Sequence, residues 1–476
     1  MEESLKMEVI STEIIKPSSP TPSNLHKLSL SHFDKMYPLV YTHMLLFYSA
    51  TTAHPVTQEL HINGLKNSLS YTLSQFYPLA GRCTDESTVT CTDEGVPFTE
   101  THITNYPMSA IVSLPQPHKS ELLYELLPPR PIDTVVPLMI QVNVFSCGGI
   151  VIGYYALHKL VDAVSLATFF RYWASASQVA SKCSANLVKP DFHAAVEAFP
   201  PNPNSVQPMP LKSTDNSNIS GHCGPNTLVK SFTFSNAAIS RLKAKAASEQ
   251  TPGSYFFGST RSFCWDPGGS SVTTLAFTLS TAANNSLKWR PWEEALQAAI
   301  AASATTFEKI TTTTFYFTAD MRSRVTPPLP RGSLGNLVAP GKAQGEKQAQ
   351  LQERVAEIHA AVLRVKASVV TLEPPGSQQK ERVDPKKYEP GVYKLTSLCK
   401  IGFHEADFGF GNPKWIILTE GVLSPSNRRN ATILTDHFDV TTGDIDGIEA
   451  WLFLEEKEMH ILQSNPSFLA FATPNY

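Results

Sequence analysis

The sequence has 476 residues, which is long for one hydrophobic core and favours two domains. Apolar residues make up 42% and charged residues 17%, as in a globular protein, and the net charge of −3 lacks the basic surplus of a protein that binds nucleic acid or anionic membranes. Seven scattered cysteines without a Cys-x-x-Cys spacing argue against a disulfide framework and a zinc site. We therefore expect no metal, no nucleic-acid partner and no membrane partner.

The N-terminus and the apolar runs predict the compartment. Residues 1–6 are acidic and lack the apolar core of a signal peptide. No stretch approaches the roughly 20 apolar residues that span a bilayer. These observations predict a cytoplasmic location.

The first part of the chain combines short extended runs with helical stripes of apolar residues. Proline ends a strand, and apolar side chains at three- and four-residue spacing indicate an amphipathic helix. In chain order we expect a strand over 13–17, a helix over 59–76, a turn over 77–82, a strand over 136–145, a hairpin turn over 147–149 and a helix over 164–173.

Residues 197–228 are rich in Pro, Asn, Ser and Gly, which predicts an interdomain linker. An N-terminal domain over 1–196 and a C-terminal domain over 229–476 would flank it. In the C-terminal part we expect a helix over 237–247, turns and short strands over 249–290, a strand over 311–318, a long amphipathic helix over 344–370, a loop over 371–390, and strands over 415–418, 431–434 and 447–454. These elements predict an α/β or α+β fold in two halves.

One histidine follows an apolar, aromatic-rich run. Residues 150–157 lead to His158, and Asp162 comes four residues later. Histidine exchanges protons near neutral pH, and the end of a buried strand would hold it rigidly, as a general base requires. The alternative is a packed, hydrogen-bonded histidine, since the chain has 14 of them.

A second segment, Asp407 to Pro413, alternates two glycines with two phenylalanines. Alternate glycines allow positive φ or close backbone approach, and aromatic side chains anchor a loop. The same pattern, considered alone, also fits an ordinary turn between strands.

Together, His158-x-x-x-Asp162 and Asp407-Phe408-Gly409-x-Gly411 resemble the plant BAHD acyltransferase family. Its members transfer an acyl group from a coenzyme A thioester to a hydroxyl or amine. Further matches occur in the family's order at residues 14–22, 76–82, 145–149, 321–330, 335–337 and 447–451. The matches at 14–22 and 145–149 resemble the vinorine synthase-like alkaloid O-acetyltransferase branch.

The resemblance implies two similar-sized mixed-sheet α/β domains, as in chloramphenicol acetyltransferase, with a solvent channel between them. His158 would lie in that channel and deprotonate the acceptor hydroxyl, which would attack the thioester without an acyl-enzyme intermediate. Acetyl-CoA would be a co-substrate, with no permanently bound cofactor. The acceptor would be a hydroxylated plant metabolite, an alkaloid or a terpenoid, and the enzyme a monomer.

The resemblance also implies roles for other residues. It gives structural roles to Asp162, Arg322, Asp407, Gly409 and Gly411, and coenzyme A contacts to Ser323, Arg324 and Phe410. Asp162 is expected to pair with an arginine, with Arg322 as first candidate and Arg324 as second. A Ser-His-Asp relay is the alternative, but no serine occupies a Gly-x-Ser-x-Gly elbow.

The chain departs from the family pattern at three places. Phe410 stands where tryptophan is usual, Asp320 where asparagine is usual, and residues 250–300 are Gly/Ser-rich instead of leading into an apolar helix. Two alternatives therefore stay open. One is hydroxycinnamoyl, benzoyl or N-acyl transfer by the same fold, and the other is a non-catalytic, degenerate family member.

Overall fold

The computed structural model describes most of both halves of the chain. The predicted turns over 249–290 and loop over 371–390 lie outside the described residues, as do residues 202–226 of the predicted linker. The described residues are 4–37, 39–49, 55–85, 87–113, 118–129, 135–178, 188–201, 227–247, 312–346, 360–361, 363–365, 392–419, 430–439 and 444–475.

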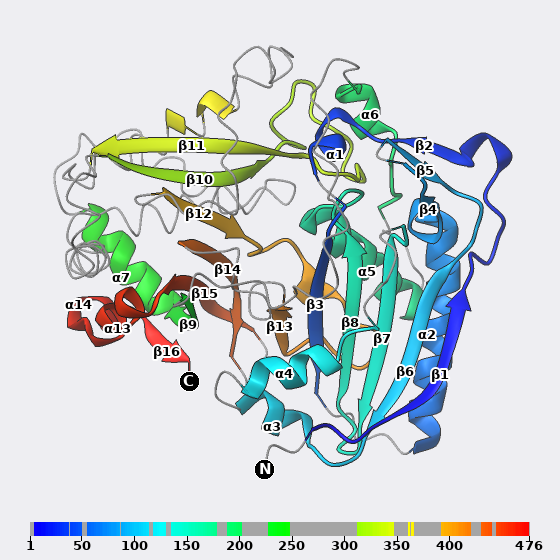
Figure 1. Cartoon of the computed structure of the whole chain (residues 1–476), viewed down its shortest axis with the longest axis horizontal. Helices are drawn as coiled ribbons and strands as arrows, with labels where there is room; N and C mark the ends of the chain where they lie inside the picture. The colour runs from blue at the N-terminus through cyan, green and yellow to red at the C-terminus, as the bar shows by residue number, and fades with distance from the viewer. Residues whose placement is uncertain are drawn as a thin grey trace.

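A six-stranded mixed sheet forms most of the first half (Figure 1). Its strands, in spatial order, are β1 (Met7–Ile15), β6 (Val96–Ile103), β7 (Leu138–Phe145), β8 (Ile150–Leu157), β3 (Tyr41–Tyr48) and β13 (Trp415–Leu418). Strands β7 and β8 pair as an antiparallel hairpin, and all their residues are buried. Their continuous apolar runs fit a sheet that is covered on both faces.

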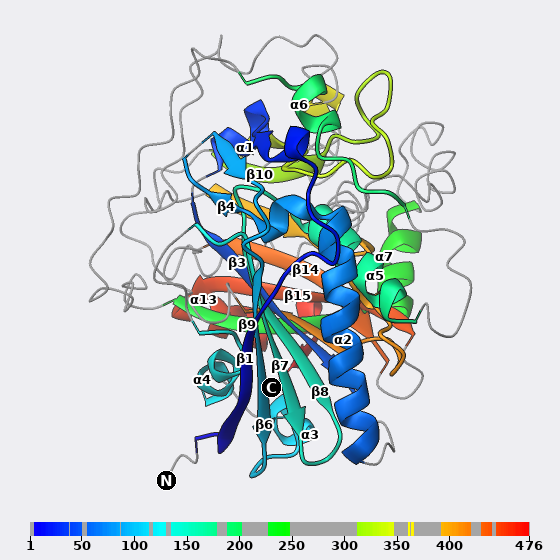
Figure 2. The ribbon, with the colours of Figure 1, turned by 90° about the vertical axis from the view of Figure 1, so that its right-hand side faces the viewer.

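Two long helices, α2 (Pro55–Gln75) and α5 (Ala163–Gln178), cover one face of this sheet (Figure 2). The predicted apolar stripe of α2 packs there, and its interior side chains are buried. Trp173 of α5 is fully buried and donates from Nε1 to the backbone oxygen of Leu65 on α2 at 3.1 Å. The helix α4 (His118–Glu125) and part of the second sheet pack against the other face.

A seven-stranded mixed sheet forms the second half. Its strands, in spatial order, are β11 (Val338–Glu346), β10 (Thr312–Asp320), β12 (Val392–Ser397), β14 (Ala431–Phe438), β15 (Ile445–Glu455), β9 (Thr227–Ser235) and β16 (Thr473–Asn475). The helices α7 (Asn236–Ala247), α13 (Glu456–Ser464) and α14 (Pro466–Leu469) accompany it. The side chains of Phe232, Met459 and Phe468 belong to its core.

Short elements complete the described chain. A three-stranded sheet has the order β2 (Lys27–Ser29), β5 (Thr88–Thr90), β4 (Arg82–Cys83). The short helices are α1 (His32–Met36), α3 (Met108–Ser113) and α6 (Ala194–Ala198), with 3₁₀ turns η1 (Ser23–Leu25), η2 (Tyr77–Ala80) and η3 (Phe403–Glu405). Among the helices of the described residues, none is both long and apolar enough to cross a bilayer.

The C-terminal half contributes one strand to the first sheet. β13 comes from the C-terminal half but pairs antiparallel with β3 at the edge of the first sheet (Figure 1). At the predicted linker, α6 extends to Ala198 and β9 begins at Thr227. The division at 197–228 stays a prediction, whereas the predicted α/β class with two mixed sheets is confirmed.

The helix predicted over 344–370 is wrong at its start. Residues 344–346 belong to β11, which pairs antiparallel with β10 along its whole length. Sheet pairing overrides the helical spacing there, because a strand neighbour satisfies the backbone groups that a helix would otherwise bond internally. Residues 360–361 and 363–365 are helical, and 347–359 and 366–370 lie outside the described residues.

Candidate functional site

His158 directly follows β8, where the structure leaves its side chain half-buried. Its backbone N–H donates to the oxygen of Val40 at 2.9 Å, which ties it to the start of β3. The ring of Tyr37 stacks on the imidazole with centroids 4.5 Å apart and an interplanar angle of 15°. Strand pairing and stacking therefore hold the ring of His158 in one place.

Asn336 brings the second half of the chain to this histidine. Asn336 lies in the connection between β10 and β11 and is fully buried. Its Oδ1 lies 3.2 Å from Nδ1 of His158, and its Nδ2 donates to the backbone oxygens of His158 at 2.8 Å and Lys159 at 3.1 Å. The site therefore forms where the ends of the two sheets meet.

Asp34 of α1 anchors Asn336. Its Oδ1 accepts from the backbone N–H of Asn336 at 2.6 Å and from Nδ2 of Asn336 at 3.0 Å. Its Oδ2 accepts from the backbone N–H and the hydroxyl of Ser31, at 3.0 and 2.6 Å, in a capping box at the start of α1. Burial raises the pKa of Asp34 above its ordinary value, although the hydrogen bonds from Ser31 and Asn336 oppose that change.

Asp162 and Arg322 form a buried bidentate pair. Nη1 of Arg322 lies 2.9 Å from Oδ2 of Asp162, and Nη2 lies 3.0 Å from Oδ1. Burial by itself raises the pKa of Asp162, but attraction to Arg322 and the hydrogen bonds outweigh it and leave the pKa below its ordinary value. The structure thus directs Asp162 toward Arg322, while the ring of His158 meets Asn336.

This pair belongs to a larger network that joins the two halves. Asp162 also accepts the backbone N–H groups of Ser165, at the start of α5, and of Leu337. The remaining partners of the Arg322 guanidinium are Asp320 Oδ1, Ser165 Oγ and the backbone oxygens of Ser333 and Gly335. Every side chain in the network is buried.

The two residues after Arg322 in the predicted coenzyme A segment differ in exposure. Ser323 is exposed and Arg324 is half-buried. Nη1 of Arg324 donates to the backbone oxygen of Asp320 at 2.5 Å. Burial lowers the pKa of Arg324, and the charge of Asp320 opposes the change.

The side chain of Asp407 closes its segment into a compact loop. Oδ1 of Asp407 accepts the backbone N–H groups of Gly409 and Gly411, each at 2.8 Å. These glycines have φ values of +101° and +93°, which side chains with a Cβ rarely adopt, although a Cβ at either position would meet no atom within 4 Å. Glycine is therefore required by the backbone angle and not by space.

The Asp407 loop packs at the end of β3 that is remote from His158. The ring of Phe410 lies 4.9 Å from that of Tyr48, the last residue of β3, in a T-shaped contact. The ring of Phe408 contacts Trp173 at 4.7 Å. His158, in contrast, follows Leu157, which pairs with the first residue of β3.

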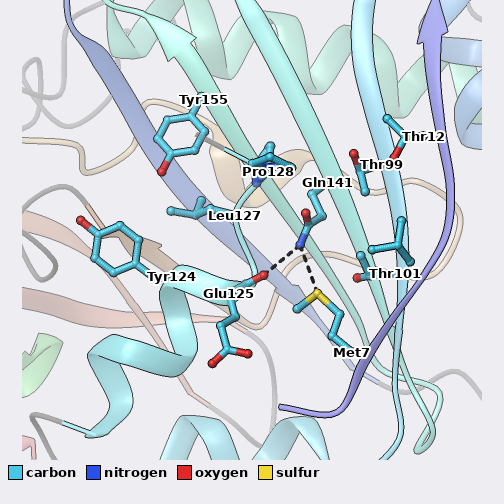
Figure 3. A pocket seen from close by; sticks show the side chains of 12 residues that line it. Met7, Thr12, Thr99, Thr101, Tyr124, Glu125, Leu127, Pro128, Gln141 and Tyr155 are labelled. Carbon is cyan, nitrogen blue, oxygen red and sulfur yellow. Dashed lines mark hydrogen bonds between the residues drawn. The ribbon is translucent and has the colours of Figure 1, made fainter. Parts of the chain in front are cut away.

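A pocket of about 400 Å³ opens on the first sheet beside β1, β6 and β7 (Figure 3). Gln141 lies at its centre, and its Nε2 donates to the backbone oxygen of Glu125 at 3.0 Å and approaches Sδ of Met7 at 4.0 Å. None of the predicted site residues lines this pocket. In the part of the chain that the structure describes, no group of three or more His, Cys, Asp or Glu side chains could hold a metal ion.

The structure thus separates the predicted residues into two places. It brings Asp162 to Arg322 beside His158, and it leaves Asp407 to Gly411 at the far end of β3. The sequence patterns did not reveal the contacts of Asn336 and Asp34. Their signals were the Gly335-Asn336-Leu337 match and the Ser31-x-x-Asp34 pattern of a capping box.

Comparison with known proteins identifies the family. The model of the family described as "Transferase family" matches residues 5–469. Limonoid 21-O-acetyltransferase of Melia azedarach is 29% identical over 99% of this chain and 99% of its own length. Stemmadenine O-acetyltransferase of Catharanthus roseus is 27% identical over 97% of each.

Solved structures agree with this fold. The crystal structure of vinorine synthase matches with a TM-score of 0.70 and 26% identity, over 97% of this chain and 98% of that one. F. sporotrichioides TRI101, crystallised with coenzyme A and T-2, shares the fold at a TM-score of 0.62 and 16% identity, over 94% of this chain and 100% of that one. The chain belongs to the BAHD acyltransferases, within the Transferase family.

Proposed function

We propose that this protein transfers an acetyl group from acetyl-CoA to a hydroxyl of a plant specialised metabolite, an alkaloid or a terpenoid. The observation that carries the proposal is the half-exposed His158, held between the two sheets by Tyr37 and Asn336. The names of relatives support the reaction, since they specify O-acetylation of a limonoid and of stemmadenine. Monomeric state and cytoplasmic location stay predictions from the sequence.

The proposed reaction needs one proton carrier. His158 accepts the proton of the acceptor hydroxyl as its oxygen attacks the thioester carbonyl carbon. The tetrahedral intermediate then collapses, the carbon–sulfur bond breaks, and the leaving thiolate takes the proton back from the imidazolium. The products are the acetyl ester and coenzyme A, and no acyl-enzyme forms. A thioester is already activated, so general-base assistance to the weakly nucleophilic hydroxyl is the step that the enzyme must supply.

The other predicted residues take supporting roles in this proposal. The Asp162–Arg322 pair fixes the loop after His158 to the second half of the chain. Ser323 and Arg324 are proposed to contact coenzyme A, because an exposed hydroxyl and a guanidinium suit its anionic phosphates. Phe410 packs against Tyr48 and Phe408, which favours a structural role over a coenzyme A contact.

The test is product formation by the purified enzyme. It is incubated with acetyl-CoA and a panel of hydroxylated alkaloids and limonoids, and mass spectrometry detects the ester while a thiol reagent detects released coenzyme A. We expect His158→Ala to reduce kcat by about 10²–10⁴-fold, the usual contribution of a general base. His102→Ala, at a partly exposed histidine of β6, is the matched control and should keep full activity.

Two outcomes would revise the proposal. Ester formation by His158→Ala at nearly the wild-type rate would remove His158 from the mechanism. Equimolar acetyl-, benzoyl- and hydroxycinnamoyl-CoA in one reaction, with alcohol or amine acceptors, test the donor and the acceptor group. Preference for a donor other than acetyl-CoA, or for an amine, would replace the proposed reaction by one of the alternatives.

A further inference from the structure

We propose that Asn336 and Asp34 are positioning residues that hold neutral His158 in the tautomer with its proton on Nδ1, so that Nε2 is the basic nitrogen. The inference rests on the proposed general-base role of His158. It adds which side chains hold the histidine ring in this tautomer. Both positioning residues are fully or almost fully buried and neither adjoins His158 in the sequence.

The orientation of the Asn336 amide is fixed by the acceptors around one of its ends. Nδ2 lies 2.8 Å from the backbone oxygen of His158 and 3.1 Å from that of Lys159, and neither oxygen can donate. Oδ1 of Asp34, at 3.0 Å, is a third acceptor there. A reversed amide would set its own oxygen against these acceptors, so the NH₂ group must face them.

The tautomer of His158 follows from this orientation. With NH₂ facing the three acceptors, Oδ1 of Asn336 is the atom 3.2 Å from Nδ1 of His158. An amide oxygen only accepts hydrogen bonds, so the hydrogen bond requires a proton on Nδ1. The lone pair of the neutral ring is then on Nε2. The imidazolium also carries a proton on Nδ1, so the same hydrogen bond persists throughout the reaction.

Asp34 fixes Asn336 because it accepts from two of its N–H groups at once. Oδ1 of Asp34 meets both the backbone N–H and Nδ2 of Asn336, while Oδ2 is occupied by Ser31. The preceding Gly335 has φ +123°, which lets the chain turn Asn336 inward. Asp34 lies in the helix α1, and Tyr37, whose ring stacks on His158, directly follows this helix.

The lysine after His158 ties this helix to the site. Lys159 is buried, with 1% of its surface exposed, and its Nζ donates to the backbone oxygen of Tyr37 at 3.0 Å. Tyr37 is the residue that follows α1, so the ammonium group lies at the negative end of that helix. This contact fixes the end of α1 that presents Tyr37 to His158, which makes the stack and the Asp34–Asn336 contact parts of one rigid unit.

The tautomer can be measured directly, without reference to activity. Selective ¹⁵N labelling of histidine gives side-chain spectra in which protonated and unprotonated ring nitrogens differ, and His158→Gln identifies the signals of His158. At a pH where the ring is neutral, we expect wild-type His158 to show a protonated Nδ1 and an unprotonated Nε2. A wild-type spectrum with the proton on Nε2 would overturn the proposal even if His158 proves essential.

Asn336→Leu tests the positioning role. We expect the proton of His158 to move to Nε2, and kcat to fall about 10²–10⁴-fold with KM for acetyl-CoA nearly unchanged, as for a base left in the wrong tautomer. Unchanged kcat or an unchanged tautomer in this variant would contradict the role of Asn336. Asp34→Ala should produce a mixture of the two tautomers, and an unaltered spectrum would remove Asp34 from the proposal.

Asn143→Leu is the matched control. Asn143 is also a fully buried asparagine, and it accepts from Thr101 and Gln141 and donates to two backbone oxygens, but it lies within β7. We expect a lower Tm and an unchanged His158 tautomer. A tautomer change in Asn143→Leu would mean that general destabilisation, not the loss of Asn336, moves the proton. An Nδ1-protonated His158 in an enzyme that tolerates His158→Ala would remove His158 from the mechanism and leave only the assignment of its tautomer.

Discussion

The two motif aspartates of this chain build opposite kinds of structure. Asp162 is buried, and its side chain bonds residues as far as 160 and 175 positions away, in the other half of the chain. Asp407 is less buried, and its side chain bonds the backbone only two and four positions ahead. The first aspartate joins two distant segments beside His158, and the second closes one loop far from it.

This difference determines whether a substitution affects only the stability of the protein or also its catalysis. A local loop can be damaged without moving the residues of the other region, because the hydrogen bonds of the Asp407 side chain begin and end within it. A long-range network cannot, since each bond sets the position of one sheet against the other. We therefore expect changes near Asp162 to affect folding and catalysis together, and changes near Asp407 to affect folding alone.

Arg322→Leu should give the largest effect. The substitution leaves the carboxylates of Asp162 and Asp320 buried without their counter-charge, and breaking such a pair costs about 3–5 kcal/mol. We expect the free energy of unfolding, measured with urea, to fall by this amount and catalysis to be lost.

The control for this prediction is Arg171→Leu, which removes an exposed ion pair. Arg171 lies 2.9 Å from Glu405, and both side chains are more than a third exposed. Exposed pairs contribute about 0–1 kcal/mol, so the loss should be small. If the two variants lost similar amounts of unfolding free energy, burial would not explain the stability of the Arg322 ion pairs.

Asp407→Ala tests the local loop in the same way. Two backbone N–H groups lose their acceptor, which should lower the free energy of unfolding by about 1–3 kcal/mol. We expect kcat per folded molecule to stay unchanged. Asp407→Asn keeps an acceptor oxygen and should lose less stability. A large fall in kcat at constant folded fraction would mean that the loop communicates with His158.

Gly409→Ala tests the backbone of the same loop. A Cβ there meets no neighbour, so only the positive φ opposes it, at a cost of about 1–2 kcal/mol. Gly64→Ala in α2 is the matched change, because its Cβ also meets no neighbour but the backbone is helical. It should stabilise by about 0.5–1 kcal/mol. Thermal unfolding should therefore shift in opposite directions, and shifts of the same sign would contradict this account.

The smallest effect is a change in the pH dependence of stability. The folded-state pKa of Asp162 lies below its ordinary value, so its contribution is fully present above the unfolded pKa of about 3.9 and is lost as the pH falls through the folded pKa. Urea unfolding of wild type and Asp162→Asn should therefore differ by a constant amount between pH 5 and 8 and converge below pH 4. If the stability difference between the two proteins grew on acidification, the pKa of Asp162 would be raised by folding and not lowered.

The local patterns of the sequence determined much of the fold. The helical stripe over 59–76 predicted most of α2, and the apolar runs around 147–149 predicted the hairpin of β7 and β8. Such elements depend on side-chain periodicity and turn residues close in sequence. The stripe over 344–370 failed at residues 344–346, because the pairing of β11 with β10 is a contact that periodicity does not encode.

At the site, the sequence determined residue types and the tertiary structure decided partners. His158 and the acidic and basic residues around it could be named from their motifs, and so could the family fold. That Asn336 faces Nδ1 of His158 and is held by Asp34, 302 residues earlier, follows only from the folded chain. The physical reason is that burial leaves these polar groups without water, so each must find its partner among whatever residues the packing of the two sheets brings within reach.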